Sequence, residues 1–307
     1  MRASNSFASC GSVTAEVGQV GGRRVIFNAD DFGLDLAVNE AVESAHRDGV
    51  LTTASLMVAA PAAEDAIARA QKLPQLGVGL HLTLVDGAPL LPPEQVPDLI
   101  DGQGRFAADL WRRGLRYFFL PRVRKQLAAE IHAQFVAFAA TGLALDHANA
   151  HKHLHLHPTV LTLMLDVGAE FGLRAVRLPW EPLQAARCGG AKGLAPALWS
   201  FFLYPWLARM RRQLDRRQVM HNDLLYGLDA TGHMDETRLL RMLHCLPATG
   251  IAEIYFHPAT TQTFALHTLM PEYEQHVEWT ALMSPRVKDY LRNQDIVKGT
   301  FGDFAVR

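Results

Sequence analysis

The sequence predicts a single α/β domain whose parallel strands form a TIM-barrel-like (β/α) barrel, irregular in places and interrupted by loop excursions. Apolar, β-branched runs alternate with amphipathic helical patterns along the chain. The length of 307 residues suits one barrel or two smaller domains, and no linker divides the sequence. Polar residues also follow several of the apolar runs, where barrel proteins hold their active sites.

The amino-terminal part of the chain shows the clearest alternation. A buried strand is expected over 24–28, and the helix after it has Asp35 as a cap and ends near Gly49. Runs rich in β-branched residues predict further strands over 52–58 and 76–85.

A helix that begins at Pro61 separates those two strands. Residues 86–121 are rich in Pro and Gly and are expected to form a long excursion, as functional loops often do. A strong amphipathic helix over 123–138 then ends before Gly142.

The second half of the chain continues the alternation. Strands are expected over 143–148 and 174–178, with a helix over 160–171 between them and a loop over 180–193. The later elements expected are a helix near 235–246, a strand over 252–256 and helices near 272–291.

The composition excludes several classes of protein. Hydrophobic residues make up 49% of the chain and charged residues 20%, as in globular proteins. A formal net charge of -1 does not suit a general nucleic-acid binder, so no nucleic-acid partner is expected. No run of about 18 apolar residues predicts a helix that spans a membrane.

Residues 1–22 are small, polar and Gly-rich, and we expect a flexible extension before one domain over 23–307. The extension lacks the apolar centre of a secretory signal. The three cysteines Cys10, Cys188 and Cys245 are far apart and odd in number. They predict reduced thiols in a cytoplasmic protein rather than a disulfide framework.

Two adjacent carboxylates end the first strand. Asp30 and Asp31 repel each other there, and a bound metal would relieve that cost for one of them and leave the other as a base. The alternative is an Asp-rich turn, which Gly33 also fits. His81 and His257 each lie at the end of a later strand, and either residue alone is weak evidence for a site.

The strongest signal is a histidine-rich tract. His147, His151, His153, His155 and His157 recur at every second position except 149, which is Asn, so on an extended chain they would share one face. Imidazole is the commonest ligand for divalent metals, and a catalytic site needs only three protein ligands. The alternative is a His-rich tract with incidental metal affinity.

These motifs resemble the YdjC-like carbohydrate deacetylases. The matching pieces occur in order and cover the chain from about residue 24 to its end. They are 28–33 (NADDFG), 79–81 (GLH), 151–155 (HKHLH) and 256–258 (FHP). The resemblance implies a barrel-like α/β fold and removal of an N-acetyl group from a sugar.

The resemblance also implies roles for particular residues. Asp31, His81 and His151 would bind the metal, Asp30 would be the general base, and His257 would be the acid or a substrate contact. Substrate binding is assigned to His153, His155 and Arg177. The metal would be zinc by preference, with magnesium, cobalt or nickel also allowed.

One departure from the family pattern concerns the support of His151. Many relatives have Asp-Ser before the histidine cluster, whereas this chain has Asn149 and Ala150.

Within the family, the stretches 24–35, 143–163 and 175–182 look like the hopanoid biosynthesis-associated deacetylases of the HpnK type. That likeness implies an N-acetylglucosamine headgroup on a hopanoid lipid as substrate. The alternatives are soluble chitooligosaccharides, a glycosidase that uses Asp30 with a distant carboxylate, and a non-catalytic carbohydrate- or metal-binding protein. A homodimer is also left open.

Aromatic and basic residues alternate over 110–122 and 198–212. Such segments suit a peripheral contact with the inner membrane, and Trp199, Phe202 and Trp206 are the expected contact residues. The alternative is a buried helix with a solvated basic face.

Overall fold

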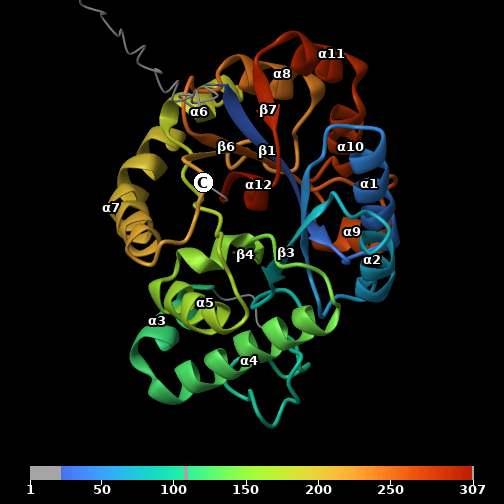
Figure 1. Ribbon diagram of the computed structural model, residues 1–307. Coiled ribbons are helices and arrows are strands. Elements are labelled where there is room, and N and C mark those ends of the chain that lie inside the picture. Colours follow the sequence, from blue (N-terminus) through green and yellow to red (C-terminus); the bar gives the residue numbers. More distant parts are fainter. Residues whose placement is uncertain (1–21, 107–109, 306–307) are drawn as a thin grey trace, which may run out of the picture.

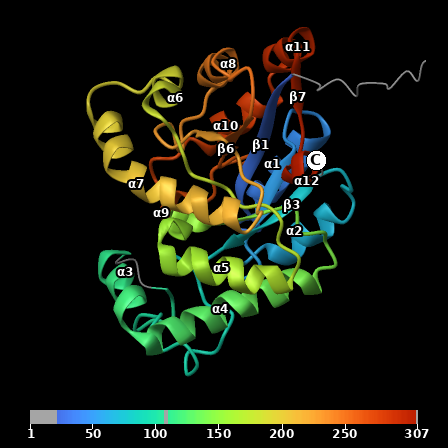
Figure 2. The same ribbon diagram turned by 60° about the vertical axis from the view of Figure 1, so that its left-hand side comes forward.

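The computed structural model describes residues 22–106 and 110–305, without the side chains of 110–113 and 195–201. The predicted extension over 1–22 therefore lies almost wholly outside the described residues. A curled parallel sheet forms the inner layer, and helices cover its outside (Figures 1 and 2). Its strands are β1 (Arg23–Phe32), β2 (Thr53–Leu56), β3 (Gly77–Leu82), β4 (Ala148–Ala150), β5 (Leu224–Tyr226), β6 (Ile251–Phe256) and β7 (Ile296–Lys298).

The helices lie mostly between successive strands, as the alternating sequence pattern predicts. A short 3₁₀ helix, η1 (His151–Leu156), follows β4. The α-helices are α1 (Leu36–Arg47), α2 (Ala63–Ala70), α3 (Leu110–Phe119), α4 (Pro121–Ala140), α5 (Pro158–Glu170), α6 (Leu183–Cys188), α7 (Ala195–Arg216), α8 (Glu236–His244), α9 (Phe264–Leu269), α10 (Gln275–Met283), α11 (Pro285–Asn293) and α12 (Phe301–Ala305).

The long, almost fully buried strand β1 lies at the centre of the sheet, whose order is β4-β3-β2-β1-β6-β5. All the strand pairs are parallel. The first residues of β1 pair with β7 and its last residues with β2, while β6 runs beside most of its length. Because parallel neighbours end at the same edge, side chains that follow β1, β3, β4 and β6 are brought together.

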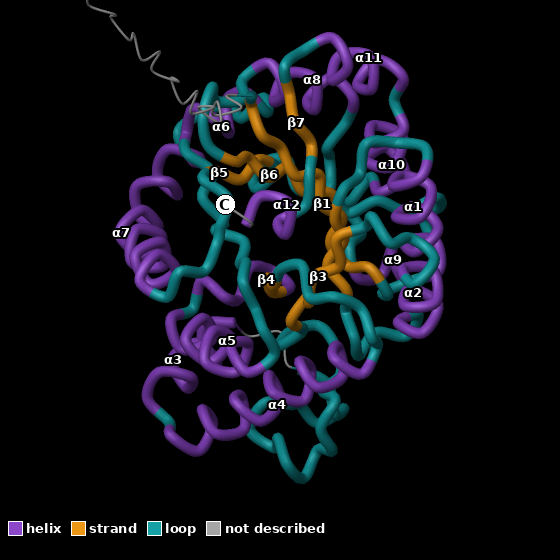
Figure 3. Tube along the Cα trace, viewed as in Figure 1, coloured by secondary structure: helices purple, strands orange, loops and turns teal. Residues whose placement is uncertain are grey.

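The sheet is a curled half-barrel rather than a closed barrel of regular strands (Figure 3). Single bridges, Ala148 to Val176 and Ala175 to Met220, cross the gap between β4 and β5. The strand predicted over 174–178 is therefore reduced to these bridges. The Asn222 side chain is one reason, because its amide bonds both the N–H and the carbonyl of Leu178 at 2.8 Å. The Asn222 side chain thus forms the hydrogen bonds with Leu178 that the backbone of a neighbouring strand would otherwise form.

Two predicted loops contain helices. The excursion over 86–121 includes α3, and the segment over 180–193 includes α6. The Glu130 carboxylate on α4 holds the start of the excursion by accepting the backbone N–H groups of Leu90 and Leu91 at 3.0 and 3.1 Å. Gly and Pro mark turns but do not exclude short helices between them, which is why the pattern missed α3 and α6.

The cysteine prediction was wrong. Cys188, at the end of α6, forms a disulfide with Cys245, which caps α8. The separation of 57 residues hid this pair, because only the fold brings the two helix ends together.

No helix in the described residues is long and apolar enough to cross a membrane. The predicted contact segment over 198–212 forms most of α7, where the Phe202 side chain is 71% exposed. Trp206 differs from the prediction, because it is only partly exposed and its indole N–H donates to the carbonyl of Leu156. The side chain of Trp199 lies outside the described residues.

The short helix α12 lies inside the ring of strands (Figure 1). Its first residue, Phe301, is fully buried and stacks on His147 with ring centroids 4.5 Å apart. The Asp146 carboxylate accepts the backbone N–H groups of Phe301 and Gly302 at 3.3 and 2.7 Å. These contacts hold residues 146 and 147, which immediately precede β4, in place against α12.

Candidate metal and catalytic site

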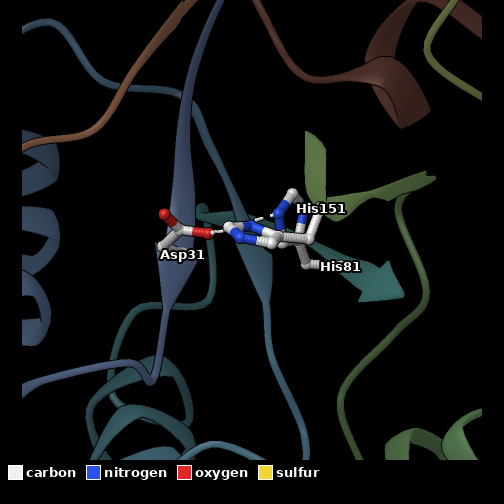
Figure 4. Close-up of side chains that lie close together, drawn as sticks. All are labelled: Asp31, His81 and His151. Atoms are coloured by element: carbon white, nitrogen blue, oxygen red, sulfur yellow. Dashed lines mark hydrogen bonds and ion pairs between the residues drawn. The ribbon is translucent and has the colours of Figure 1, made fainter. Parts of the chain in front are cut away.

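Three of the predicted metal ligands lie together at the carboxyl ends of the strands. Asp31 comes from the end of β1, His81 from β3 and His151 from the turn after β4 (Figure 4). One Asp31 carboxylate oxygen, Oδ1, lies 3.0 Å from His151 Nδ1 and 3.3 Å from His81 Nε2. One ligand atom from each residue lies within 4.8 Å of the others.

This donor set fits a divalent metal. Zinc bound at about 2.0–2.2 Å in tetrahedral geometry has ligands roughly 3.3 Å apart, close to the two distances from Asp31. The second Asp31 oxygen, Oδ2, is buried and has no hydrogen-bond partner in the described part of the chain. A buried carboxylate oxygen without a partner is costly, and a cation is the partner that its charge requires.

The backbone at the end of β1 turns sharply to present Asp31. Asp31 has a φ of 61° and Gly33 a φ of 98°, both in the left-handed region that few side chains tolerate. A Cβ on Gly33 would also lie 3.2 Å from Ala63 and from the Met57 carbonyl. The Asn39 side chain accepts the Gly33 N–H at 2.8 Å and locks the turn.

The ring of His81 is oriented by Asn149, which pairs with it across β3 and β4. Asn149 Oδ1 lies 2.5 Å from His81 Nδ1, so this nitrogen carries the proton and Nε2 keeps its lone pair for a metal. The sequence raised doubt about the support of His151. The geometry instead makes Asn149 the support of His81.

Asp30 lies beside the metal cluster and is held by Arg177. The guanidinium donates to both carboxylate oxygens, Nη1 to Oδ2 at 2.6 Å and Nη2 to Oδ1 at 3.0 Å, and it also pairs with Glu253. Asn28 and Asn149 donate to Oδ1 at 2.9 and 3.2 Å. Burial favours the neutral acid, but the charge and hydrogen bonds of Arg177, together with the charges of His81 and His257, outweigh it and hold the pKa of Asp30 far below its ordinary value.

Asp30 and Asp31 are both ionised and buried, so the site is stabilised by a nearby positive charge. Burial opposes ionisation of Asp31, but the charge of His151 and hydrogen bonds from both imidazoles keep its pKa well below the ordinary value. Burial alone would lower the pKa of His81, yet Asp30 and Asp31 raise it. Without a cation the two carboxylates therefore favour a proton on His81, and a divalent metal would take its place.

The histidine-rich tract is not extended, so its members do not share a face. Residues 151–156 form η1, and Lys152 and His153 both have a φ of 52°. His151 faces Asp31, while the ring of His155 is buried and bonds the Arg177 carbonyl at 3.0 Å. His157 instead caps α5 by accepting the Thr159 N–H at 3.2 Å. The turns of η1 thus point each imidazole in its own direction.

The three residues predicted to bind substrate occupy different depths. His153 lines the cavity, where its Nε2 lies 3.4 Å from the Tyr255 hydroxyl. His155 and Arg177 are fully buried and outside the cavity lining, so the structure places them behind the wall rather than against a substrate. The contacts of Arg177 are with Asp30, Glu253 and the face of the Tyr255 ring at 4.8 Å.

His257 follows β6 and also lines the cavity. Its ring lies between those of Tyr255 and Tyr273, with centroids 5.5 and 5.1 Å away. Its Nδ1 is buried without a partner among the described residues, and its backbone N–H donates to Glu278. Burial lowers the pKa of His257, which leaves a neutral imidazole free to exchange a proton in the cavity.

The cavity above these groups has a volume of about 200 Å³. Its polar lining includes His81 and His151 of the metal cluster, Asp30 and His257. Asp86 and Lys152 form an ion pair in its wall. The apolar lining residues are Leu34, Met57, Leu228, Leu269 and Met270.

Sequence reasoning missed several polar residues beneath the site. Asn28, Ser55 and Glu253 are fully buried and contact Asp30, Asn149 or Arg177. A polar side chain at an inward position of a buried strand is the signal that would have found them, because such a group needs a partner.

The fold and the site define a barrel-like α/β protein with an Asp-His-His cluster at the carboxyl ends of its strands, suited to a divalent metal. The chain belongs to the YdjC-like protein family, whose model matches residues 24–293. It is 31% identical over 286 residues to a carbohydrate deacetylase of Brevibacillus brevis, which covers 92% of this chain and 100% of that protein.

Other relatives match over a shorter part. A carbohydrate deacetylase of Vibrio cholerae is 38% identical over 150 residues, 48% of this chain and 56% of that protein. One from Geobacillus stearothermophilus is 37% identical over 165 residues, 54% of this chain and 62% of that protein. Among solved structures, a protein of Enterococcus faecalis described as a proposed cellobiose-phosphate cleavage protein has a TM-score of 0.71. The two chains are 23% identical, and the match covers 93% of this chain and 100% of the other. At this identity the likeness shows a shared fold alone.

Proposed function

We propose that this protein is a metal-dependent N-deacetylase that hydrolyses the acetamide of an N-acetylglucosamine group. The observation that carries the proposal is the meeting of Asp31, His81 and His151 beside the ionised Asp30. The full-length likeness to a carbohydrate deacetylase supports the same chemistry. Zinc suits this mixed nitrogen and oxygen donor set best, and magnesium, cobalt or nickel are the alternatives.

When bound, a divalent metal would polarise the acetyl carbonyl and lower the pKa of a water molecule from near 16 toward about 7. Asp30 accepts a proton as water attacks the carbonyl carbon. His257, neutral at rest, takes up the proton that Asp30 then releases and gives it to the nitrogen of the sugar as the carbon–nitrogen bond breaks. Acetate and a free amino sugar leave, so one amide and one water are consumed in each turnover.

Arg177 serves this reaction as a positioning residue. Its two bonds to Asp30 hold the carboxylate ionised and aimed, while Glu253 accepts hydrogen bonds from its Nε and Nη2. The same pairing makes Asp30 a weak base, because a carboxylate with a depressed pKa gives up a proton readily. His153 and the ion pair of Asp86 with Lys152 lie where a sugar ring would sit.

We further propose a lipid-linked substrate, the N-acetylglucosamine headgroup of a hopanoid, for an enzyme that is cytoplasmic and peripheral on the inner membrane. Support comes from the α3–α7 surface, whose exposed apolar side chains are Leu115, Phe118, Phe119, Leu120, Phe202 and Tyr204. The rings of Phe118 and Trp206 lie 6.3 Å apart, so the two helices adjoin. Soluble chitooligosaccharides are the second candidate substrate.

Acetate release tests the activity. We expect the purified protein to release acetate from an N-acetylglucosamine oligomer and from an N-acetylglucosaminyl hopanoid. A chelator should abolish both activities, and added zinc should restore them. Release that survives chelation would remove the metal from the mechanism, and metal binding without release would leave a carbohydrate- or metal-binding protein. Faster release from the soluble oligomer would favour the second candidate substrate.

The membrane contact predicts a split between two substrates. Phe119→Ser combined with Phe202→Ser removes side chains that are 74% and 71% exposed. Liposome binding and deacetylation of the lipid-linked sugar should each fall at least about tenfold, because burial of an aromatic side chain contributes about 1.5–3 kcal/mol. Hydrolysis of a soluble substrate should not change.

The matched control is Phe264→Ser on α9, which removes an equally exposed phenylalanine outside the α3–α7 surface. Equal loss of both activities in the double variant would show a structural role for the two rings. Loss of neither would contradict the membrane contact.

A further inference from the structure

A line of three polar residues, Asp146, His147 and Ser55, runs beneath the metal cluster. Asp146 Oδ2 lies 2.9 Å from His147 Nδ1, and His147 Nε2 lies 3.0 Å from Ser55 Oγ. Ser55 and His147 are completely buried, and none of the three lines the substrate cavity. The order resembles that of a serine hydrolase, but a nucleophile that no substrate can reach has no chemistry to perform. We therefore consider what Asp146, His147 and Ser55 do to the side chains that Ser55 contacts.

The donors and acceptors of this line have one consistent order. The Asp146 carboxylate already accepts two backbone N–H groups from α12, so it is an acceptor, and His147 must donate to it from Nδ1. His147 Nε2, at 3.0 Å, lies nearer to Ser55 Oγ than the other acceptor, Asn28 Oδ1 at 3.4 Å, and takes the only proton of the Ser55 hydroxyl. Ser55 Oγ is left with its lone pairs.

Those lone pairs face two side-chain amides. Ser55 Oγ accepts Asn149 Nδ2 at 2.9 Å and Asn28 Nδ2 at 3.1 Å. The Asn149 amide is therefore turned with its NH₂ group toward Ser55 and its oxygen toward His81 Nδ1. A reversed amide would place its oxygen against the lone pairs of Ser55 and its NH₂ group against the N–H of His81.

We propose that Asp146, His147 and Ser55 are positioning residues that fix the orientation of the Asn149 amide and thereby hold His81 with Nε2 toward the metal. The inference rests on the proposed metal site. It also explains a requirement of this particular chain. A carboxylate at position 149 would accept from His81 with either oxygen, whereas an amide works in only one orientation.

Asp30 alone is a poor anchor for this amide. Its bond from Asn149 Nδ2 is longer, 3.2 Å against 2.9 Å for Ser55. In the proposed reaction Asp30 also takes up a proton, which weakens it as an acceptor during each turnover. Ser55 keeps the same protonation throughout, so the orientation of His81 survives the step.

Zinc affinity of the Ser55→Ala variant tests the proposal. Loss of a residue that orients a ligand typically weakens metal binding 10- to 100-fold. We expect a loss of about tenfold, at the low end because Asp30 still contacts the amide. Affinity is measured by competition with a chelator. Thr52→Val is the control, because it removes a buried hydroxyl that bonds only the backbone of Phe27.

A second variant isolates the orientation of the amide. In an Asn149→Asp background, Ser55→Ala should weaken zinc binding less than threefold, about a third of the tenfold loss in the parent. An equal loss in both backgrounds would show that Ser55 does not act through the amide, and this would overturn the proposal. A Ser55→Ala affinity within about twofold of the parent would overturn it as well.

The parent protein supplies a test that needs no folded variant. In zinc-loaded protein with ¹⁵N-labelled histidine, His81 should bind zinc through Nε2 and carry its proton on Nδ1. Zinc on Nδ1 would overturn the inference and leave the deacetylase proposal standing. A parent protein that binds no zinc would instead contradict the proposed metal site itself.

Discussion

Replacing Asp31, His81 or His151 by alanine is expected to abolish both metal binding and acetate release. Each change removes one of three donors, and three are the minimum for a catalytic site. Because losing a residue that only orients a ligand costs 10- to 100-fold in affinity, loss of a ligand should exceed about 100-fold. Elemental analysis measures the bound metal, and circular dichroism verifies the fold.

His153→Ala is the matched control for this series. It removes an imidazole from the same tract and the same cavity, but His153 lies outside the three-donor cluster. This variant should keep its metal and lose activity only through substrate contacts. Full metal content in one of the three alanine variants would exclude that residue as a ligand, and metal loss in His153→Ala would add a fourth.

Asp30→Asn is expected to keep the metal and lose turnover. A positioned base typically contributes about 10²–10⁴ in rate, and an amide cannot accept the proton. We expect a loss near 10², because pairing with Arg177 already weakens Asp30 as a base. Steady-state acetate release gives kcat, and metal analysis separates loss of the base from loss of the site.

Asp35→Asn is the control for that change. Asp35 belongs to the same segment but caps α1 by accepting the Ala37 N–H at 2.9 Å, a role that asparagine fills equally well. Its turnover should match that of the parent. If Asp30→Asn also matched the parent, the base would be a neutral imidazole of the cavity wall, His153 or His257.

The sequence predicted the parts of this fold that depend on local periodicity. The expected cap at Asp35 and the buried face of α4, from Val123 to Phe138, are both confirmed. In these elements one apolar stripe decides both the local structure and the packing. The half-barrel could not be foreseen, because the gap beside β4 depends on the Asn222 side chain, far from it in sequence.

The candidate site likewise has residues that the sequence motifs predicted and contacts that only the fold determines. The motifs marked Asp31, His81 and His151, and strand topology alone suffices to bring those three residues together. The distinct roles of the neighbouring histidines depend on the left-handed backbone at Lys152 and His153, which residue type does not encode. The partners of Arg177 likewise lie 147 and 76 residues away, beyond any local pattern.

The disulfide between Cys188 and Cys245 has a consequence for α7. The helix lies wholly within the 57-residue loop that this bond closes, and its exposed rings belong to the α3–α7 surface. Closing such a loop restricts the unfolded chain by roughly 4 kcal/mol in the chain-entropy model. The bond therefore keeps α6 joined to α8 even when the chain between them is cut. A protease cut inside α7 would yield two fragments that stay linked until a reductant is added.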